Sequence, residues 1–186
     1  MKLVVVPLIP LNCHLIDCSS IMVFSGADYA NPMRFTTYRE QIWTFLENKV
    51  DSDKLKTVPQ VWGELEFNDP AAWERLRPRR NQFLLPSEHD TDLRIINILS
   101  KYPKLVDKNQ HYTRDPADPY LIAYAQKWGL PIICDEKPLE QRIGARKSKR
   151  LMIPDVCKLE KNMICINLEK YLKDEGVIPQ SYDPTE

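Results

Sequence analysis

The chain has 186 residues, of which 43% are hydrophobic and 28% are charged, so it is long enough for one domain with a substantial core. Its 26 basic and 26 acidic residues cancel to a formal net charge of zero. This balance excludes a global basic field, so a polyanion could be held only by a local basic patch or by a metal ion.

The cysteines and histidines exclude further classes of site. Five cysteines without a Cys-x-x-Cys pair favour reduced, buried thiols in a cytoplasmic protein over a disulfide framework. Three scattered histidines argue against a His-rich zinc site and against a Ser-His-Asp triad.

Residues 1–12 are predicted to form an N-terminal arm or a leading strand. Their apolar run is interrupted by two prolines, is too short to cross a membrane and lacks the small-residue cleavage site of a signal peptide. We therefore expect no membrane association. The main domain is predicted at residues 13–176, and residues 177–186 are predicted to form a flexible tail.

Residues 14–23 are predicted to form a short buried strand followed by a second apolar stretch. Asp17 closes the strand, and Ser19 and Ser20 are placed to cap the helix after it. An acid in this position is also common in ordinary turns. It is significant because an acid closes a second hydrophobic strand later in the chain.

The helix after residue 57 is predicted to begin with a capping box, in which Thr57 is the cap and Gln60 follows three residues later. Glu64 lies at the centre of that helix, beside its apolar stripe. Such a glutamate is usually a surface residue, but a buried one would need a cation or a metal ion as its partner.

Two basic clusters flank the acidic positions, one at residues 75–80 and one at residues 142–150. Each can be read as a solvated face, although two such clusters around a carboxylate edge would suit a phosphodiester backbone. The residues predicted to bind nucleic acid are Arg75, Arg79, Arg80, Arg142, Arg146 and Lys147.

Residues 115–136 form the most informative stretch of the chain. Asp115 is predicted to cap a helix that has Pro116 in its first turn and that ends at Gly129. A short apolar strand follows and ends in two carboxylates, Asp135 and Glu136.

In a strand–helix–strand crossover, the helix begins near the carboxyl edge of a parallel sheet and the next strand ends at that same edge, where ligands bind. Asp118 and Glu136 should therefore lie close together. The plainer alternatives are that Asp118 only complements the helix dipole and that Asp135 and Glu136 form a solvated turn.

Helices that alternate with short apolar strands predict an α/β fold, arranged as a three-layer α/β/α sandwich around a mainly parallel sheet. Four acids then line up at helix and strand ends or on an early helix: Asp17, Glu64, Asp118 and Glu136.

The order of the motifs resembles a known family. The runs LIDCSSIM, VPQVWGEL and DPADPYLIAYAQKWGLPIICDE resemble the PIN-domain nucleases. The runs FNDPAAWERL and LMIPDVCKLEKNMICINLEKYL make the chain similar to the PIN-like branch called the domain-of-unknown-function 4411 family. The resemblance covers roughly residues 15–172.

This resemblance implies a parallel sheet whose carboxyl edge carries acids that hold Mg²⁺ or Mn²⁺. The acids carried over as catalytic and metal-binding are Asp17, Glu64, Asp118 and Glu136. Asp135 is the alternative to Glu136 as the fourth acid. Ser19 matches the small polar residue two places after the first acid, and Cys134 stands where the commoner pattern has threonine.

We therefore predict a metal-dependent endoribonuclease that cleaves single-stranded RNA with metal-activated water, as the toxin of a toxin–antitoxin pair. Single-stranded RNA, a small antitoxin protein and a second copy of the chain are the partners that this interpretation allows. Two alternatives stay open. One is an inactive PIN-like module that binds nucleic acid or protein, favoured by Cys134 and the absent basic charge. The other is a hydrolase of small phosphate-containing molecules.

Overall fold

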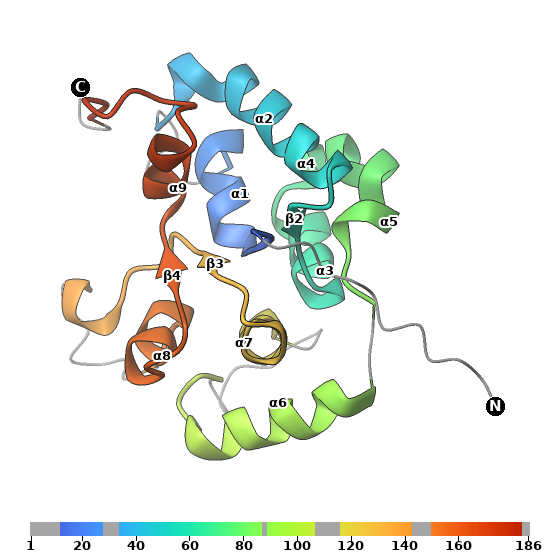
Figure 1. Cartoon of the computed structure of the whole chain (residues 1–186), viewed down its shortest axis with the longest axis vertical. Helices are drawn as coiled ribbons and strands as arrows, with labels where there is room; N and C mark the ends of the chain where they lie inside the picture. The colour runs from blue at the N-terminus through green and yellow to red at the C-terminus, as the bar shows by residue number, and fades with distance from the viewer. Residues whose placement is uncertain (1–11, 28–33, 87–88, 107–115, 143–149, 184–186) are drawn as a thin grey trace.

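The computed structural model describes residues 12–27, 34–86, 89–106, 116–142 and 150–183. At the centre of these residues lies a four-stranded, all-parallel sheet with the strand order β2-β1-β3-β4 (Figure 1). The strands are β1 (His14–Ile16), β2 (Leu55–Lys56), β3 (Ile132–Ile133) and β4 (Cys165–Ile166). The predicted α/β class with a parallel sheet is confirmed.

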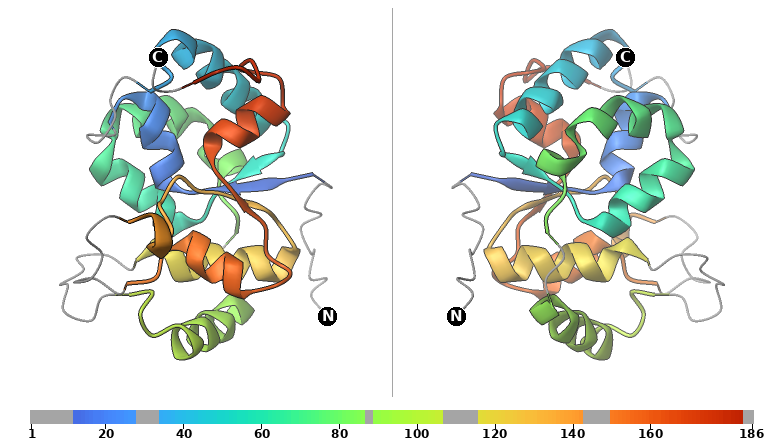
Figure 2. Two further views of the ribbon diagram at one scale, coloured as in Figure 1. Left: turned by 90° about the vertical axis from the view of Figure 1, so that its left-hand side faces the viewer. Right: turned by 90° about the vertical axis from the view of Figure 1, so that its right-hand side faces the viewer.

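Helices cover both faces of this sheet. They are α1 (Cys18–Ser25), α2 (Arg39–Asp51), α3 (Pro59–Asn68), α4 (Pro70–Leu76), α5 (Arg80–Phe83), α6 (His89–Lys101), α7 (Ala117–Trp128), α8 (Ile153–Leu159) and α9 (Leu168–Asp174), with 3₁₀ turns at Thr36–Tyr38, Arg77–Arg79 and Leu139–Gln141. Helices α1, α2 and α9 lie on one side of the sheet and α7 and α8 on the other, with α6 packed outside α7 (Figure 2).

The two central strands pair through apolar residues because helices bury this part of the sheet from both sides. Leu15 and Ile16 of β1 pair with Ile132 and Ile133 of β3, and all four side chains are completely buried. Helix α7 is buried along most of its length between the sheet and α6. It ends at Gly129 in the left-handed conformation, as its position in the sequence predicted.

Three predicted helix starts differ from the observed ones. Thr57 does not cap α3, because its hydroxyl donates to the carbonyl of Ile16 at 2.8 Å and so ties the helix to β1. Ser19 and Ser20 lie inside α1, whose cap is Asp17. Helix α7 begins at Ala117, one residue later than predicted, and Asp115 lies outside the described residues.

The packed chain extends beyond residue 176. Val177 and Ile178 are buried, and the ring of Tyr182 stacks on Phe35 with 5.2 Å between the ring centroids. The Tyr182 hydroxyl also accepts a hydrogen bond from the backbone of Phe35 at 3.0 Å. Val177, Ile178 and Tyr182 of the predicted tail therefore pack on the core, whereas the other described residues of the tail are exposed.

All five cysteines are free thiols, and four of them are buried, as the sequence predicted. In the described part of the chain, no helix combines the length and the hydropathy that a membrane span needs.

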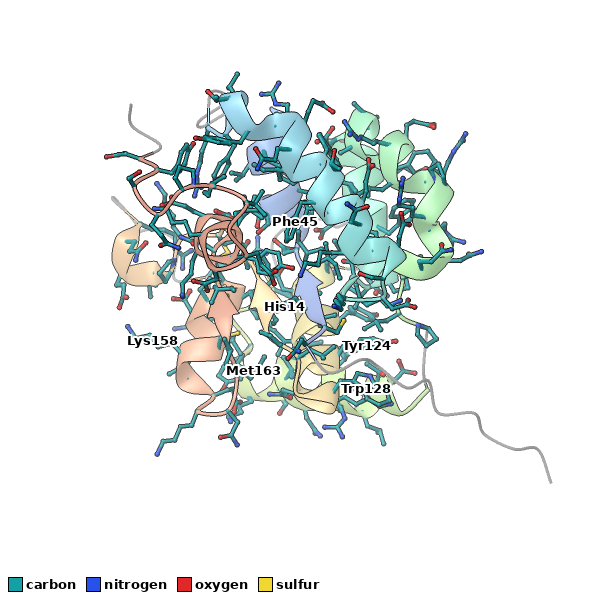
Figure 3. All side chains as sticks on the ribbon, turned by 45° about the horizontal axis from the view of Figure 1, so that its top comes forward. His14, Phe45, Tyr124, Trp128, Lys158 and Met163 are labelled. Carbon is teal, nitrogen blue, oxygen red and sulfur yellow. The ribbon has the colours of Figure 1, made fainter. Side chains whose placement is uncertain are left out.

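The two edges of the sheet differ in chemistry. At the amino edge, His14 begins β1 and Met163 precedes β4, and the ring of His14 packs against Tyr171 (Figure 3). The buried acids Asp17 and Asp118 lie at the carboxyl edge, where Asp17 follows β1 and Cys134 follows β3.

Candidate functional site

The first acid of the candidate site is Asp17, which follows β1 and caps α1. Only 4% of the residue is exposed, and its Oδ2 accepts hydrogen bonds from the Ser19 hydroxyl at 2.5 Å and from the Ser19 backbone at 3.1 Å. Burial raises the pKa of Asp17, and the two hydrogen bonds from Ser19 act in the opposite direction.

Asp118 lies in the first turn of α7, at the same edge of the sheet. It is only 7% exposed, and its Oδ2 lies 3.1 Å from Nη2 of Arg150. Burial and the negative charge of Asp17 raise the pKa of Asp118 to about 6, although Arg150 acts to lower it. A carboxylate this buried does more than complement a helix dipole from the surface.

Glu64 reaches the site from α3. Its Oε1 accepts a hydrogen bond from the backbone nitrogen of Ala117 at 3.1 Å, which places it beside the first turn of α7. Burial, together with the charges of Asp17 and Asp118, raises the pKa of Glu64 to about 7.

Glu136 comes just after β3, as the crossover predicted. Its Oε2 accepts a hydrogen bond from the backbone of Ile153, the first residue of α8, at 3.2 Å. Burial raises the pKa of Glu136 to about 8, with further contributions from the negative charges of Asp118 and Asp17. Asp118 and Glu136 thus share one electrostatic environment.

The four predicted acids come from four separate segments and repel one another, but each is held by a different donor of the chain. Among the residues that the structure describes, no three His, Cys, Asp or Glu side chains are arranged so that they could hold a metal ion. The sharing of one cation therefore stays a prediction.

The sequence comparison agrees with the extent of this fold. The family model described as "Domain of unknown function (DUF4411)" matches residues 14–178. The chain belongs to the DUF4411 family. The searches of curated proteins and of solved structures found no match to the chain.

In this DUF4411 protein, Asp135 faces away from the acid cluster. Its Oδ1 pairs with Nη1 of Arg34 at 2.9 Å, and its Oδ2 accepts hydrogen bonds from the Ser20 hydroxyl and the Leu168 backbone, both at 2.9 Å. Oδ2 of Asp135 thus joins α1 to the start of α9, and Oδ1 holds Arg34. The geometry favours Glu136 over Asp135 as the fourth acid.

Ser19 and Cys134 connect the acids to one another. The Ser19 hydroxyl donates to Asp17 and accepts a hydrogen bond from the Asp135 backbone at 3.2 Å. The Cys134 sulfur lies 3.8 Å from Asp17 Oδ2 and 3.8 Å from Glu136 Oε2. A thiol is only a weak donor, so it holds these two carboxyl groups less firmly than a hydroxyl would.

The predicted basic residues of the first cluster are largely engaged within the fold of this DUF4411 protein. Arg75 pairs with Glu47 at 2.6 Å and with Glu40 at 2.9 Å, and Arg79 pairs with Asp51 at 3.0 Å. These ion pairs brace α4 and the turn after it against α2. Arg80 is exposed, Arg142 pairs with Asp155 at 3.0 Å, and Arg146 and Lys147 lie outside the described residues.

Sequence reasoning assigned no role to Asp155, which lies in the first turn of α8. Its carboxylate accepts hydrogen bonds from the backbones of Leu139 at 2.7 Å and Met152 at 2.9 Å. Arg142 also pairs with Asp155. Asp155 therefore connects the 3₁₀ turn at Leu139–Gln141 to the residue that precedes α8. The signal in the sequence was the Pro-Asp pair, which is typical of a first helical turn.

Beside Glu136, a pocket of about 330 Å³ opens at the carboxyl ends of β3 and β4. Its polar walls include Arg34, Lys137, Gln141 and Asn167. The cluster of acids is thus continuous with a surface that carries both hydrogen-bond donors and positive charge.

Proposed function

We propose that this DUF4411 protein is a metal-dependent endoribonuclease that cleaves single-stranded RNA, with Mg²⁺ or Mn²⁺ as its cofactor. One observation supports this proposal above the others: four carboxyl groups from four segments, of which Asp17 and Asp118 are buried and Glu64 and Glu136 are half-buried, act on one another at the carboxyl edge of a parallel sheet. Their pKa values are raised by burial and by mutual repulsion. Clusters of this kind are typical of functional sites, because a bound cation relieves the repulsion between the carboxylates.

The donor chemistry fits a hard divalent cation. Mg²⁺ and Mn²⁺ prefer oxygen ligands, keep several waters and are commonly held by a few carboxylates together with substrate phosphate. To share an ion, the acids would turn away from their present donors, which include Ser19, Arg150 and Ile153. A bound cation would promote the attack of water on phosphorus and stabilise the charge of the leaving oxygen.

The chain itself supplies positioning and proton binding. Ser19 fixes Asp17, while Asp118 is fixed by α7 and by Arg150. With pKa values of about 7 and 8, Glu64 and Glu136 hold protons near neutral pH when no cation is near. They would release those protons when a cation binds, because ligands must be deprotonated.

The membership of this chain in the PIN superfamily is part of the same proposal. The order of its four acids along the chain and the all-parallel sheet support that membership. We also propose that the protein is the toxin of a toxin–antitoxin pair in the cytoplasm, with a small antitoxin as its partner. This role rests only on the resemblance to the PIN-domain nucleases. Growth arrest on expression of the wild-type protein, absent for Asp118→Asn, would support it.

The decisive experiment for the ribonuclease is the Asp118→Asn substitution. It removes one negative charge with little change in shape, so Mn²⁺-dependent cleavage of single-stranded RNA should be lost while the thermal unfolding transition is kept. Asp174→Asn is the matched control, because Asp174 is exposed and forms a surface ion pair with Lys170, one turn earlier in α9. Full cleavage by the Asp118→Asn variant would remove the assignment.

A second candidate function is a scaffold that binds nucleic acid or protein without catalysis. The separate hydrogen-bond donors of the four acids and the weakly donating Cys134 favour it. Calorimetric titration with Mn²⁺ separates the two functions, because a scaffold should show no heat that disappears in the Asp17→Asn and Asp118→Asn variants.

A further inference from the structure

We infer that Arg150 is a built-in counterion that competes with the divalent cation for Asp118 and, once displaced, contacts the phosphate of the substrate. This inference rests on the proposed ribonuclease function. Its basis is the ion pair between Arg150 Nη2 and Asp118 Oδ2 at 3.1 Å. Among the described residues, no other lysine or arginine forms an ion pair with any of the four acids.

The charge of Arg150 is felt beyond Asp118. It lowers the pKa of Glu64 and of Glu136, against the burial and repulsion that raise both. Arg150 therefore provides positive charge to at least three of the four acids. A divalent cation at this place would do the same, so the two cations cannot both stay there without strong repulsion.

The backbone of Arg150 is anchored while its side chain is long. Its carbonyl accepts a hydrogen bond from Nη2 of Arg142 at 2.7 Å, and Arg142 is held in turn by Asp155. The next residue, Leu151, donates its backbone N–H to the carbonyl of Lys104 at 2.9 Å. The guanidinium itself also donates its Nε–H to the carbonyl of Leu105 at 3.2 Å. Nη2 can leave Asp118 by rotation of the side chain about this anchored backbone, with the contact to Leu105 kept or exchanged for water.

Exposure and chemistry indicate where the guanidinium would go. The side chain of Arg150 is 26% exposed, whereas that of Asp118 is 10% exposed, so Arg150 approaches the acid from the solvent side. A phosphate would reach the same acids from solvent. The planar guanidinium matches a phosphate through two parallel hydrogen bonds, which makes arginine well suited to this contact.

Removal of Arg150 should change the affinity for Mn²⁺ in opposite directions for a structural role and for a competing role. If Arg150 only supported the structure, its removal would weaken the site and lower its affinity for a cation. If Arg150 competes with the cation, its removal should raise that affinity, because Asp118 no longer has to be vacated. Affinity for Mn²⁺ in the absence of RNA therefore distinguishes the two roles.

The test is a calorimetric titration of the full chain with Mn²⁺, followed by a cleavage assay on single-stranded RNA at saturating Mn²⁺. Arg150→Gln should bind Mn²⁺ about fivefold more tightly than the wild type and cleave RNA about 100-fold more slowly. Arg150→Lys should keep an affinity close to that of the wild type, because it keeps the competing charge. Arg94→Gln, at an exposed position of α6, is the matched control and should change neither quantity.

The outcomes test the two parts of the inference separately. Equal or weaker Mn²⁺ binding by Arg150→Gln overturns the competition, and unchanged cleavage overturns the contact with phosphate. In either case, binding and cleavage by the wild type leave the ribonuclease proposal intact. Absence of Mn²⁺ binding in both proteins overturns the ribonuclease proposal and this inference with it. Arg150→Met, which keeps the apolar stem, gives the same readout should Arg150→Gln fail to fold.

Discussion

The carboxylate of Glu64 accepts a hydrogen bond from the backbone nitrogen of Ala117 at 3.1 Å, so that the middle of α3 is joined to the start of α7. This contact places the second predicted acid next to the residue that precedes the third. It also satisfies one of the N–H groups that the first turn of a helix leaves without a partner inside the helix.

Replacement of Glu64 by Gln keeps an acceptor for Ala117 and removes the negative charge. The repulsion from Asp17 and Asp118 then disappears, so we expect the free energy of unfolding at pH 8 to rise by about 1 kcal/mol. Urea unfolding measures this quantity. Glu66→Gln, at an exposed position of the same helix, should leave it unchanged, and a loss of stability only in Glu64→Gln would contradict the account.

The pH dependence of stability tests the raised pKa of Glu136. Because this pKa is about 8 in the folded protein and near 4.5 in the unfolded chain, the folded state binds more protons between these values. Stability of the metal-free protein should therefore fall as the pH rises through this window, by on the order of 1–2 kcal/mol between pH 6 and pH 8.

Glu136→Gln should lose less stability over the same two pH units, whereas Glu140→Gln, an exposed neighbour, should behave as the wild type does. Parallel pH curves for all three proteins would show that Glu136 is ionised normally in the folded state. Urea unfolding at the two pH values supplies the comparison.

The choice between Asp135 and Glu136 as the fourth acid predicts two different phenotypes. Asp135→Asn disrupts the buried pair with Arg34 and should lower the free energy of unfolding by about 3 kcal/mol, while the folded fraction keeps its affinity for Mn²⁺. Glu136→Gln should lose that affinity and stay folded. Thermal unfolding and calorimetry on both variants check the pair, and the reverse pattern would reassign the acid.

Proton release gives a fourth prediction. Binding of Mn²⁺ at pH 7 should displace protons from Glu64 and Glu136, whose pKa values are about 7 and 8. The binding enthalpy should then vary with the ionisation enthalpy of the buffer. A heat that is the same in phosphate and in Tris would indicate that no proton leaves these groups.

The sequence predicted those features of the site that follow from chain topology. Asp118 and Glu136 could be placed together because a parallel crossover returns the chain to the same edge of the sheet. The alternation of side chains along an extended segment explains why Asp135 turns toward Arg34 while Cys134 and Glu136 share the other side.

The features that it missed depend on contacts between distant segments. Thr57 fits a capping box, but the carbonyl of Ile16 in a neighbouring strand is the partner of its hydroxyl. The arginines after α4 suggested a free basic face, because the acids of α2 that pair with Arg75 and Arg79 could not be located from spacing. The pairing of Arg150 with Asp118 likewise depends on the fold of the segment before α8.

The most direct test of the central claim is a crystal of the protein soaked in Mn²⁺ and measured at the manganese absorption edge. We expect an anomalous peak about 2.1 Å from oxygens of at least two of the four acids, with Arg150 turned away from Asp118. The four acids are Asp17, Glu64, Asp118 and Glu136. A crystal saturated with Mn²⁺ that shows no peak among them, with each carboxylate still on its present donor, would contradict the account.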